Sequence, residues 1–109
     1  MQEERLKILL SYVEQEPEDP FNRYALAMEY LKNDADKALV HLQMLHKEHP
    51  DYLALYYQLG SLYLEKEAYD NAIKVLEEGL LLAQKQENAK AIKEIGGLLQ
   101  QVKDELEEW

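Results

Sequence analysis

The sequence predicts an all-α protein in which antiparallel helix hairpins stack into a solenoid of about six helices. Apolar residues recur at spacings of three and four through most of the 109 residues, as in amphipathic helices, and no stretch alternates as a half-buried strand does. One motif also occurs twice, with its parts displaced by 59 − 26 = 33 and 72 − 38 = 34 positions. A repeat of ~34 residues is typical of stacked helix pairs. Because the connections are short, successive helices are expected to pack antiparallel.

The first three helices are expected over residues 2–16, 20–32 and 35–48. The first helix carries apolar residues on one face at the i, i+3, i+4 and i+7 positions, namely Leu6, Leu9, Leu10 and Val13. Pro17 ends it, and Pro20 lies in the first turn of the second helix, where its missing N–H costs nothing. Pro50 ends the third helix because proline cannot continue the hydrogen-bond pattern.

The last three helices are expected over residues 51–66, 70–85 and 89–109. Asp51 is the expected N-cap of the fourth helix, since its carboxylate can accept hydrogen bonds from the free N–H groups of the first turn. Asp70 is expected to serve similarly near the start of the fifth. The sixth helix has apolar residues three and four positions apart, namely Ile92, Ile95, Leu99, Val102 and Leu106.

The repeated motif consists of a Leu next to a small residue, a Tyr, and a later Ala followed by a bulky apolar residue. Its members are Leu26, Ala27, Tyr30, Ala38 and Leu42 in the first copy, and Leu59, Gly60, Tyr63, Ala72 and Leu76 in the second. With Tyr56 ahead of it, the second copy resembles the tetratricopeptide repeat, and the first copy resembles it with Arg23 in place of the aromatic residue. Ala27, Gly60 and Gly96 are expected where paired helices approach most closely.

The resemblance implies one domain over residues 1–109 with the superhelix of tetratricopeptide repeats. The expected parts are an N-terminal helix at 1–19, repeat 1 at 20–50, repeat 2 at 51–86 and a C-terminal capping helix at 87–109. In this family the first helices of the pairs line a concave groove, where a second apolar stripe of this chain would lie. The candidate peptide-binding residues are Phe21, Tyr24, Met28, Leu31, Tyr57, Ser61, Leu64, Lys90 and Lys93. Alternatively, a terminal helix or a second copy of the chain covers this stripe.

Some tetratricopeptide domains clamp the acidic C-terminus of heat-shock chaperones with Lys, Asn and Arg side chains. At the matching positions this chain has Tyr24, Met28, Gln58, Lys90 and Glu94, so that only Lys90 agrees. An apolar or helical peptide is therefore the expected ligand.

Twelve Lys and Arg against twenty-two Asp and Glu give a net charge of −10, which would repel nucleic acid and anionic membranes. The chain has no cysteine for a thiolate metal site, and nothing in it approaches the ~20 apolar residues of a membrane span. Its acidic start differs from the basic start of a signal peptide. We expect a cytoplasmic protein that binds neither nucleic acid nor membrane.

Three histidines and an acidic turn are the remaining groups that could bind a metal or take part in acid–base chemistry. His41, His46 and His49 lack a carboxylate or cysteine at ligand spacing on the same face, so solvated surface histidines are expected in place of a metal site. The acidic turn of Glu65, Glu67 and Asp70 is expected to be solvated as well. No nucleophile–base pair or cofactor motif is present, which predicts a protein that is not an enzyme and needs no cofactor.

The leading hypothesis is therefore a non-catalytic adaptor or scaffold that binds a peptide or helix of another protein in its groove. The alternative is self-association into a homodimer, through the same apolar face or through the stripe of Ile92, Ile95, Leu99 and Val102 on the sixth helix.

Overall fold

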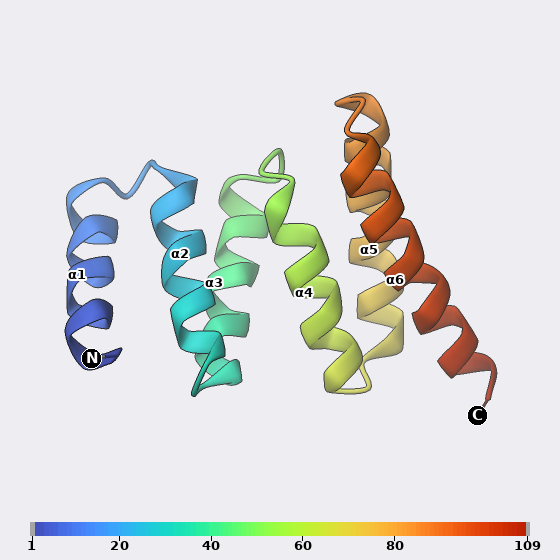
Figure 1. The fold of residues 1–109 in the computed structure, drawn as a ribbon, viewed down its shortest axis with the longest axis horizontal. Coiled ribbons are helices and arrows are strands. Elements are labelled where there is room, and N and C mark those ends of the chain that lie inside the picture. Colours follow the sequence, from blue (N-terminus) through green and yellow to red (C-terminus); the bar gives the residue numbers. More distant parts are fainter. Residues whose placement is uncertain (1, 109) are drawn as a thin grey trace. The chain divides into compact units, whose positions relative to one another are not determined.

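The computed structural model describes residues 2–108, so that Met1 and Trp109, the latter part of the expected sixth helix, lie outside the described residues. Within them the chain contains helices and no strand (Figure 1). The helices are α1 Gln2–Gln15, α2 Pro20–Leu31, α3 Ala35–Glu48, α4 Ala54–Glu65, α5 Tyr69–Lys85 and α6 Ala89–Glu107. The predicted all-α fold of helix hairpins is confirmed. None of these helices combines the length and apolar character that crossing a bilayer requires.

The chain divides into two compact units, Met1–Tyr52 and Leu53–Trp109. In the first unit α2 packs between α1 and α3, and in the second unit α4, α5 and α6 all contact one another. The Leu and small residues of both copies of the repeated motif are buried: Leu26, Ala27, Ala38, Leu42, Leu59, Gly60, Ala72 and Leu76. Burial of this apolar area is the main stabilising term of each core.

The stripe on α6 that could have mediated self-association belongs to the core of the second unit. Ile95, Leu99 and Val102 are all buried where α6 packs against its neighbours. Ile92 is half-buried. These side chains stabilise the unit itself.

Polar side chains cap three of the helices. Asp19 accepts a hydrogen bond from the N–H of Phe21 at 3.0 Å at the start of α2, next to Pro20 in the first turn. Asp34 caps α3, and Asn88 caps α6 by accepting from the N–H of Ala91 at 3.0 Å. Such caps satisfy N–H groups that have no partner within the helix.

The two expected caps on α4 and α5 are wrong. Asp51 lies outside α4, because a hydrogen bond of 3.0 Å from the N–H of Tyr52 to the carbonyl of His49 closes a turn over 49–52 and delays the helix. Asp70 lies inside the first turn of α5, which begins at Tyr69. Its carboxylate there still faces the positive end of the helix dipole.

Two tight turns join α4 to α5 and α5 to α6 in the same way. Glu67 and Glu87 have φ angles of 58° and 54°, in the left-handed region where glycine is more usual. After Glu67, the N–H of Ala68 donates to the carbonyl of Tyr63 at 2.9 Å, which closes the end of α4. Both turns reverse the chain within a few residues and set α4, α5 and α6 alongside one another.

Close contact between α4 and α5 depends on two glycines. A Cβ added at Gly60 would overlap the side chain of Leu76, and one added at Gly79 would lie 2.5 Å from the Cβ of Tyr56. The prediction that Gly60 lies at a close approach is confirmed. The same prediction is wrong for Gly96, where the nearest atom to an added Cβ is Leu80 Cδ1 at 3.9 Å, an ordinary contact.

Candidate functional site

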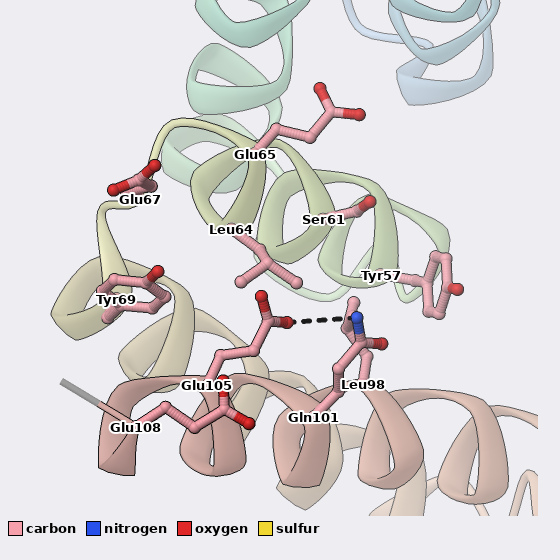
Figure 2. Close-up of a pocket in the computed structure, with 10 residues that line it drawn as sticks. All are labelled: Tyr57, Ser61, Leu64, Glu65, Glu67, Tyr69, Leu98, Gln101, Glu105 and Glu108. Atoms are coloured by element: carbon pink, nitrogen blue, oxygen red, sulfur yellow. Dashed lines mark hydrogen bonds between the residues drawn. The ribbon is translucent and has the colours of Figure 1, made fainter.

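The second unit contains a groove between α4 and α6, which run beside each other in the same direction (Figure 1). Its larger part is a hollow of about 700 Å³ (Figure 2). The residues that line it are Tyr57, Ser61, Leu64 and Glu65 of α4, Glu67 and Tyr69 at the following turn, and Leu98, Gln101, Glu105 and Glu108 at the C-terminal half of α6. Leu64 of α4 and Gln101 and Glu105 of α6 point toward the space between the two helices in Figure 2.

A second hollow of about 500 Å³ extends the groove toward the start of α6. It shares Tyr57, Leu98 and Gln101 with the first hollow. Its other lining residues are Lys90, Lys93, Glu94 and Gly97. The two hollows together are referred to below as the α4–α6 groove.

Tyr57 lies where the two hollows meet, and its side chain is 40% exposed. Leu64 is half-buried and Leu98 is buried, so the middle of the groove is apolar, with the Ser61 hydroxyl and the Gln101 amide as polar groups. The aromatic ring can bury area and hydrogen-bond through its hydroxyl. This chemistry suits a peptide better than a small charged substrate.

Five of the nine candidate residues named from the sequence thus line one groove: Tyr57, Ser61, Leu64, Lys90 and Lys93. The other four, Phe21, Tyr24, Met28 and Leu31, lie on α2 of the first unit. Of these, Phe21 is 61% exposed, and the ring of Tyr24 packs 5.6 Å from that of Tyr52. That all nine residues form one binding groove stays a prediction.

Sequence reasoning missed the part of the groove formed by the second half of α6. Leu98, Gln101, Glu105 and Glu108 line it and are spaced three, four and three positions apart. This is one face of a helix, so the signal was present in the sequence. It was masked because the buried stripe of α6 has the same spacing on a neighbouring face.

The first unit holds one buried carboxylate, that of Glu29 on α2, which is 6% exposed. Its Oε1 lies 2.8 Å from Arg5 Nε on α1 and 3.1 Å from Lys32 Nζ. Two cations therefore offset the cost of burying this charge. Glu29 of α2 thus joins α1 to α2 through its ion pair with Arg5.

His41 is partly buried in the first unit and contacts Arg23 and Tyr30, which corrects the expectation that all three histidines are solvated. Its Nδ1 lies 3.0 Å from Arg23 Nη1, and its ring stacks on Tyr30 with centroids 5.4 Å apart. Because arginine has only donors, Nδ1 must be the unprotonated acceptor. Burial, and then the charge of Arg23, lower the pKa of His41 below 6.5. Within residues 2–108 no group of three or more His, Cys, Asp or Glu side chains could hold a metal ion.

We expect the stability of the chain to fall as the pH is lowered through the range just below 6.5. In that range the unfolded chain binds a proton at His41 while the folded chain, with its lowered pKa, does not, so the free energy of unfolding decreases until the folded-state pKa is passed. Urea unfolding at a series of pH values would measure this. The His41→Gln variant should lose that component of the pH dependence, whereas His49→Gln should keep it. Equal pH dependence in all three proteins would contradict the assignment.

Comparison with known proteins agrees with this geometry. The family model described as tetratricopeptide repeat matches residues 21–95. A crystal structure of a tetratricopeptide repeat domain protein from Salinibacter ruber is 36% identical, with a TM-score of 0.75, and the match covers 78% of this chain and 97% of that one. A solution structure of a tetratricopeptide repeat domain protein from the same organism is 38% identical, with a TM-score of 0.76 and coverage of 81% and 90%.

A solution structure of a protein from Bordetella parapertussis shares the fold, with 24% identity, a TM-score of 0.76 and coverage of 92% and 88%. A search of curated protein sequences gave no match. The family match extends over more than half of the chain and includes both copies of the repeated motif. The chain therefore belongs to the tetratricopeptide repeat family.

Proposed function

We propose that this protein is a non-catalytic interaction module, an adaptor or scaffold, that binds a peptide or helix of another protein. The observation that carries the proposal is the α4–α6 groove, with an exposed aromatic side chain, Tyr57, above an apolar centre formed by Leu64 and Leu98. An exposed aromatic ring beside leucine side chains in a groove offers both contact area and a hydrogen-bonding hydroxyl to a peptide. Tetratricopeptide repeats commonly serve in protein interaction, and stacked helix repeats offer extended binding surfaces.

The proposal includes a partner that is a protein and neither nucleic acid nor membrane, and a location in the cytoplasm. A net charge of −10 supports the first part, because phosphate groups would be repelled. The absence of catalysis is supported by the chemistry of the groove. Its polar groups are the hydroxyls of Tyr57, Ser61 and Tyr69, an amide, carboxylates and two lysines, and its lining includes no histidine that could serve Ser61 as a base.

The test is a pull-down from the lysate of the source organism with three immobilised baits: the native chain, Tyr57→Lys and Leu81→Lys. Leu81 lies on α5, is 69% exposed and lines neither hollow of the groove, so it is a matched control for placing a lysine at an exposed apolar position. Circular dichroism would show that each bait is folded. A protein retained by the native chain and by Leu81→Lys, but lost by Tyr57→Lys, would support the groove as the binding site.

Two outcomes would contradict the proposal. If all three baits retain the same proteins, Tyr57 is not part of the binding surface. If the native bait retains only further copies of itself, the alternative of self-association through the same apolar face is correct. Sedimentation at several concentrations would then give the size of the assembly.

A further inference from the structure

The two ends of the α4–α6 groove carry opposite charge. One end is lined by carboxylates from three segments: Glu65 at the end of α4, Glu67 in the next turn, and Glu105 and Glu108 at the end of α6. Figure 2 shows the Glu105 carboxylate between α4 and α6 and the Glu65 carboxylate directed away from α6. Among residues 2–108, no lysine or arginine forms an ion pair with any of these four. Only Glu105 has a polar side-chain partner, the amide of Gln101 at 3.2 Å. The four residues are called the acidic end of the groove.

The opposite end is lined by Lys90 and Lys93 in the first two turns of α6, beside Glu94. Lys93 and Glu105 are 105 − 93 = 12 residues apart on one helix, which corresponds to about 18 Å at the rise of an α-helix. An extended segment of about six residues spans that distance. Between the ends lie the apolar side chains of Leu64 and Leu98, with Tyr57 at the junction of the hollows.

The acidic end has the wrong form for a single cation. Its carboxylates line an open hollow of about 700 Å³ whose wall includes Leu64, Tyr69 and Leu98. No group of three or more carboxylates or imidazoles in the described part of the chain could close around one ion. A peptide with several separate cationic side chains suits these carboxylates better than a single ion does. Apolar residues of the same peptide can contact the leucines in the middle of the groove.

A second copy of the chain would be a poor occupant of this groove. Each copy carries a net charge of −10, so two copies repel each other over the range of their fields. The densest basic stretch in the sequence, Lys85, Lys90 and Lys93, is interrupted by Glu87 and includes the two lysines of the groove itself. Charge complementarity therefore favours a partner different from this chain.

We propose that the α4–α6 groove binds a segment of a partner protein with an apolar centre and with Lys or Arg side chains at one end, which enter the acidic end of the groove. Lys90 and Lys93 disfavour a second basic cluster at the other end of the segment and favour acidic residues there. The charges thus set the orientation of the segment, while the apolar centre supplies contact area. This inference rests on the proposed function, and it adds the chemistry of the ligand.

Fluorescence anisotropy with three labelled peptides tests the inference. All three share the centre Leu-Ala-Tyr-Ala-Leu-Ala and have blocked termini. The bipolar peptide has two lysines before the centre and two glutamates after it, the acidic peptide has glutamates at both ends, and the basic peptide has lysines at both ends. The native protein should bind the bipolar peptide about tenfold more tightly than the acidic one, with the basic peptide between them, and high salt should reduce the differences.

Charge reversal in the protein makes the test specific. Glu105→Lys/Glu108→Lys leaves two glutamates and two lysines at the acidic end of the groove, so the preference for the bipolar peptide over the acidic one should be lost. Glu77→Lys/Glu87→Lys changes the net charge equally at exposed positions that do not line the groove, and it should keep the native order. Circular dichroism would show that both variants are folded.

The outcomes separate this inference from the proposed function. If the peptides bind equally, or if both double variants change the order alike, charge at the acidic end does not select the ligand, and the inference is overturned. If none of the peptides binds, it is overturned as well. The pull-down with Tyr57→Lys decides the proposed function independently, because it requires no assumption about the charge of the partner.

Discussion

Replacement of Gly79 by leucine is expected to lower the free energy of unfolding by about 3 kcal/mol. A Cβ at this position would lie 2.5 Å from Cβ and 2.8 Å from Cγ of Tyr56. The Cβ atom of Tyr56 is attached directly to the backbone of α4, so it cannot rotate away as the end of a flexible side chain can. The larger residue must therefore separate α4 from α5 or displace the buried ring, and urea unfolding would measure the cost.

Gly97→Ala is the matched control for this experiment. Gly97 also lies inside a helix, but a Cβ added there would meet no atom within 4 Å. Alanine at such a position should stabilise the chain by roughly 0.5–1 kcal/mol, because glycine loses more backbone freedom on folding. An unfolding midpoint for Gly79→Leu equal to that of the native chain would show that the two helices do not meet closely at this glycine.

The positions of the helices could be predicted from the sequence because their signals are local. The spacing of apolar residues and the places of Pro17, Pro20 and Pro50 act within a few neighbouring residues. The start of α4 was missed for a different reason. It depends on the backbone hydrogen bond between Tyr52 and His49. Pro50 stands at the second position of that turn, where proline is favoured, but it was interpreted only as the end of the preceding helix.

The glycines show where a motif alone is insufficient. Gly60 and Gly96 occupy the same place in the repeat pattern, yet only Gly60 is at a close approach. The reason is that Leu76, which contacts Gly60, belongs to the next helix along the chain, α5. No further helix follows α6 within the described residues to pack on Gly96 in that way.

The two repeats differ at two pairs of corresponding positions. Tyr56 of the second repeat corresponds to Arg23 of the first, since 56 − 23 = 33, and Gly79 corresponds to Leu45, since 79 − 45 = 34. In the second repeat the broad ring of Tyr56 thus occurs together with Gly79. In the first repeat the narrower stem of Arg23 occurs together with Leu45. Arg23 reaches the helix across from it through a contact of 3.5 Å to Met44 Sδ. Such paired changes were visible in the sequence, but their meaning required knowing that Tyr56 contacts Gly79.

Only part of the candidate site could be predicted from the sequence. Tyr57 and Leu64 follow from the period of a single helix. The acidic end required knowing that Glu65, Glu67 and Glu105, which come from different segments, line one hollow. Each carboxylate taken alone is an ordinary solvated residue, and only the packing of α4 beside α6 makes them one surface.

Truncation of Tyr56 to alanine is expected to cost about 4 kcal/mol of stability, because its side chain is 1% exposed and its removal leaves a cavity. The hydrogen bond of 2.9 Å from its hydroxyl to Glu78 Oε2 is lost as well. The double variant Tyr56→Ala/Gly79→Leu should be more stable than the sum of the single effects predicts, by about 2 kcal/mol, since the leucine then fills the space left by the ring. In contrast, Tyr56→Ala/Gly97→Ala should be additive. Additivity in both double variants, measured by urea unfolding, would mean that residues 56 and 79 do not share one space in the core.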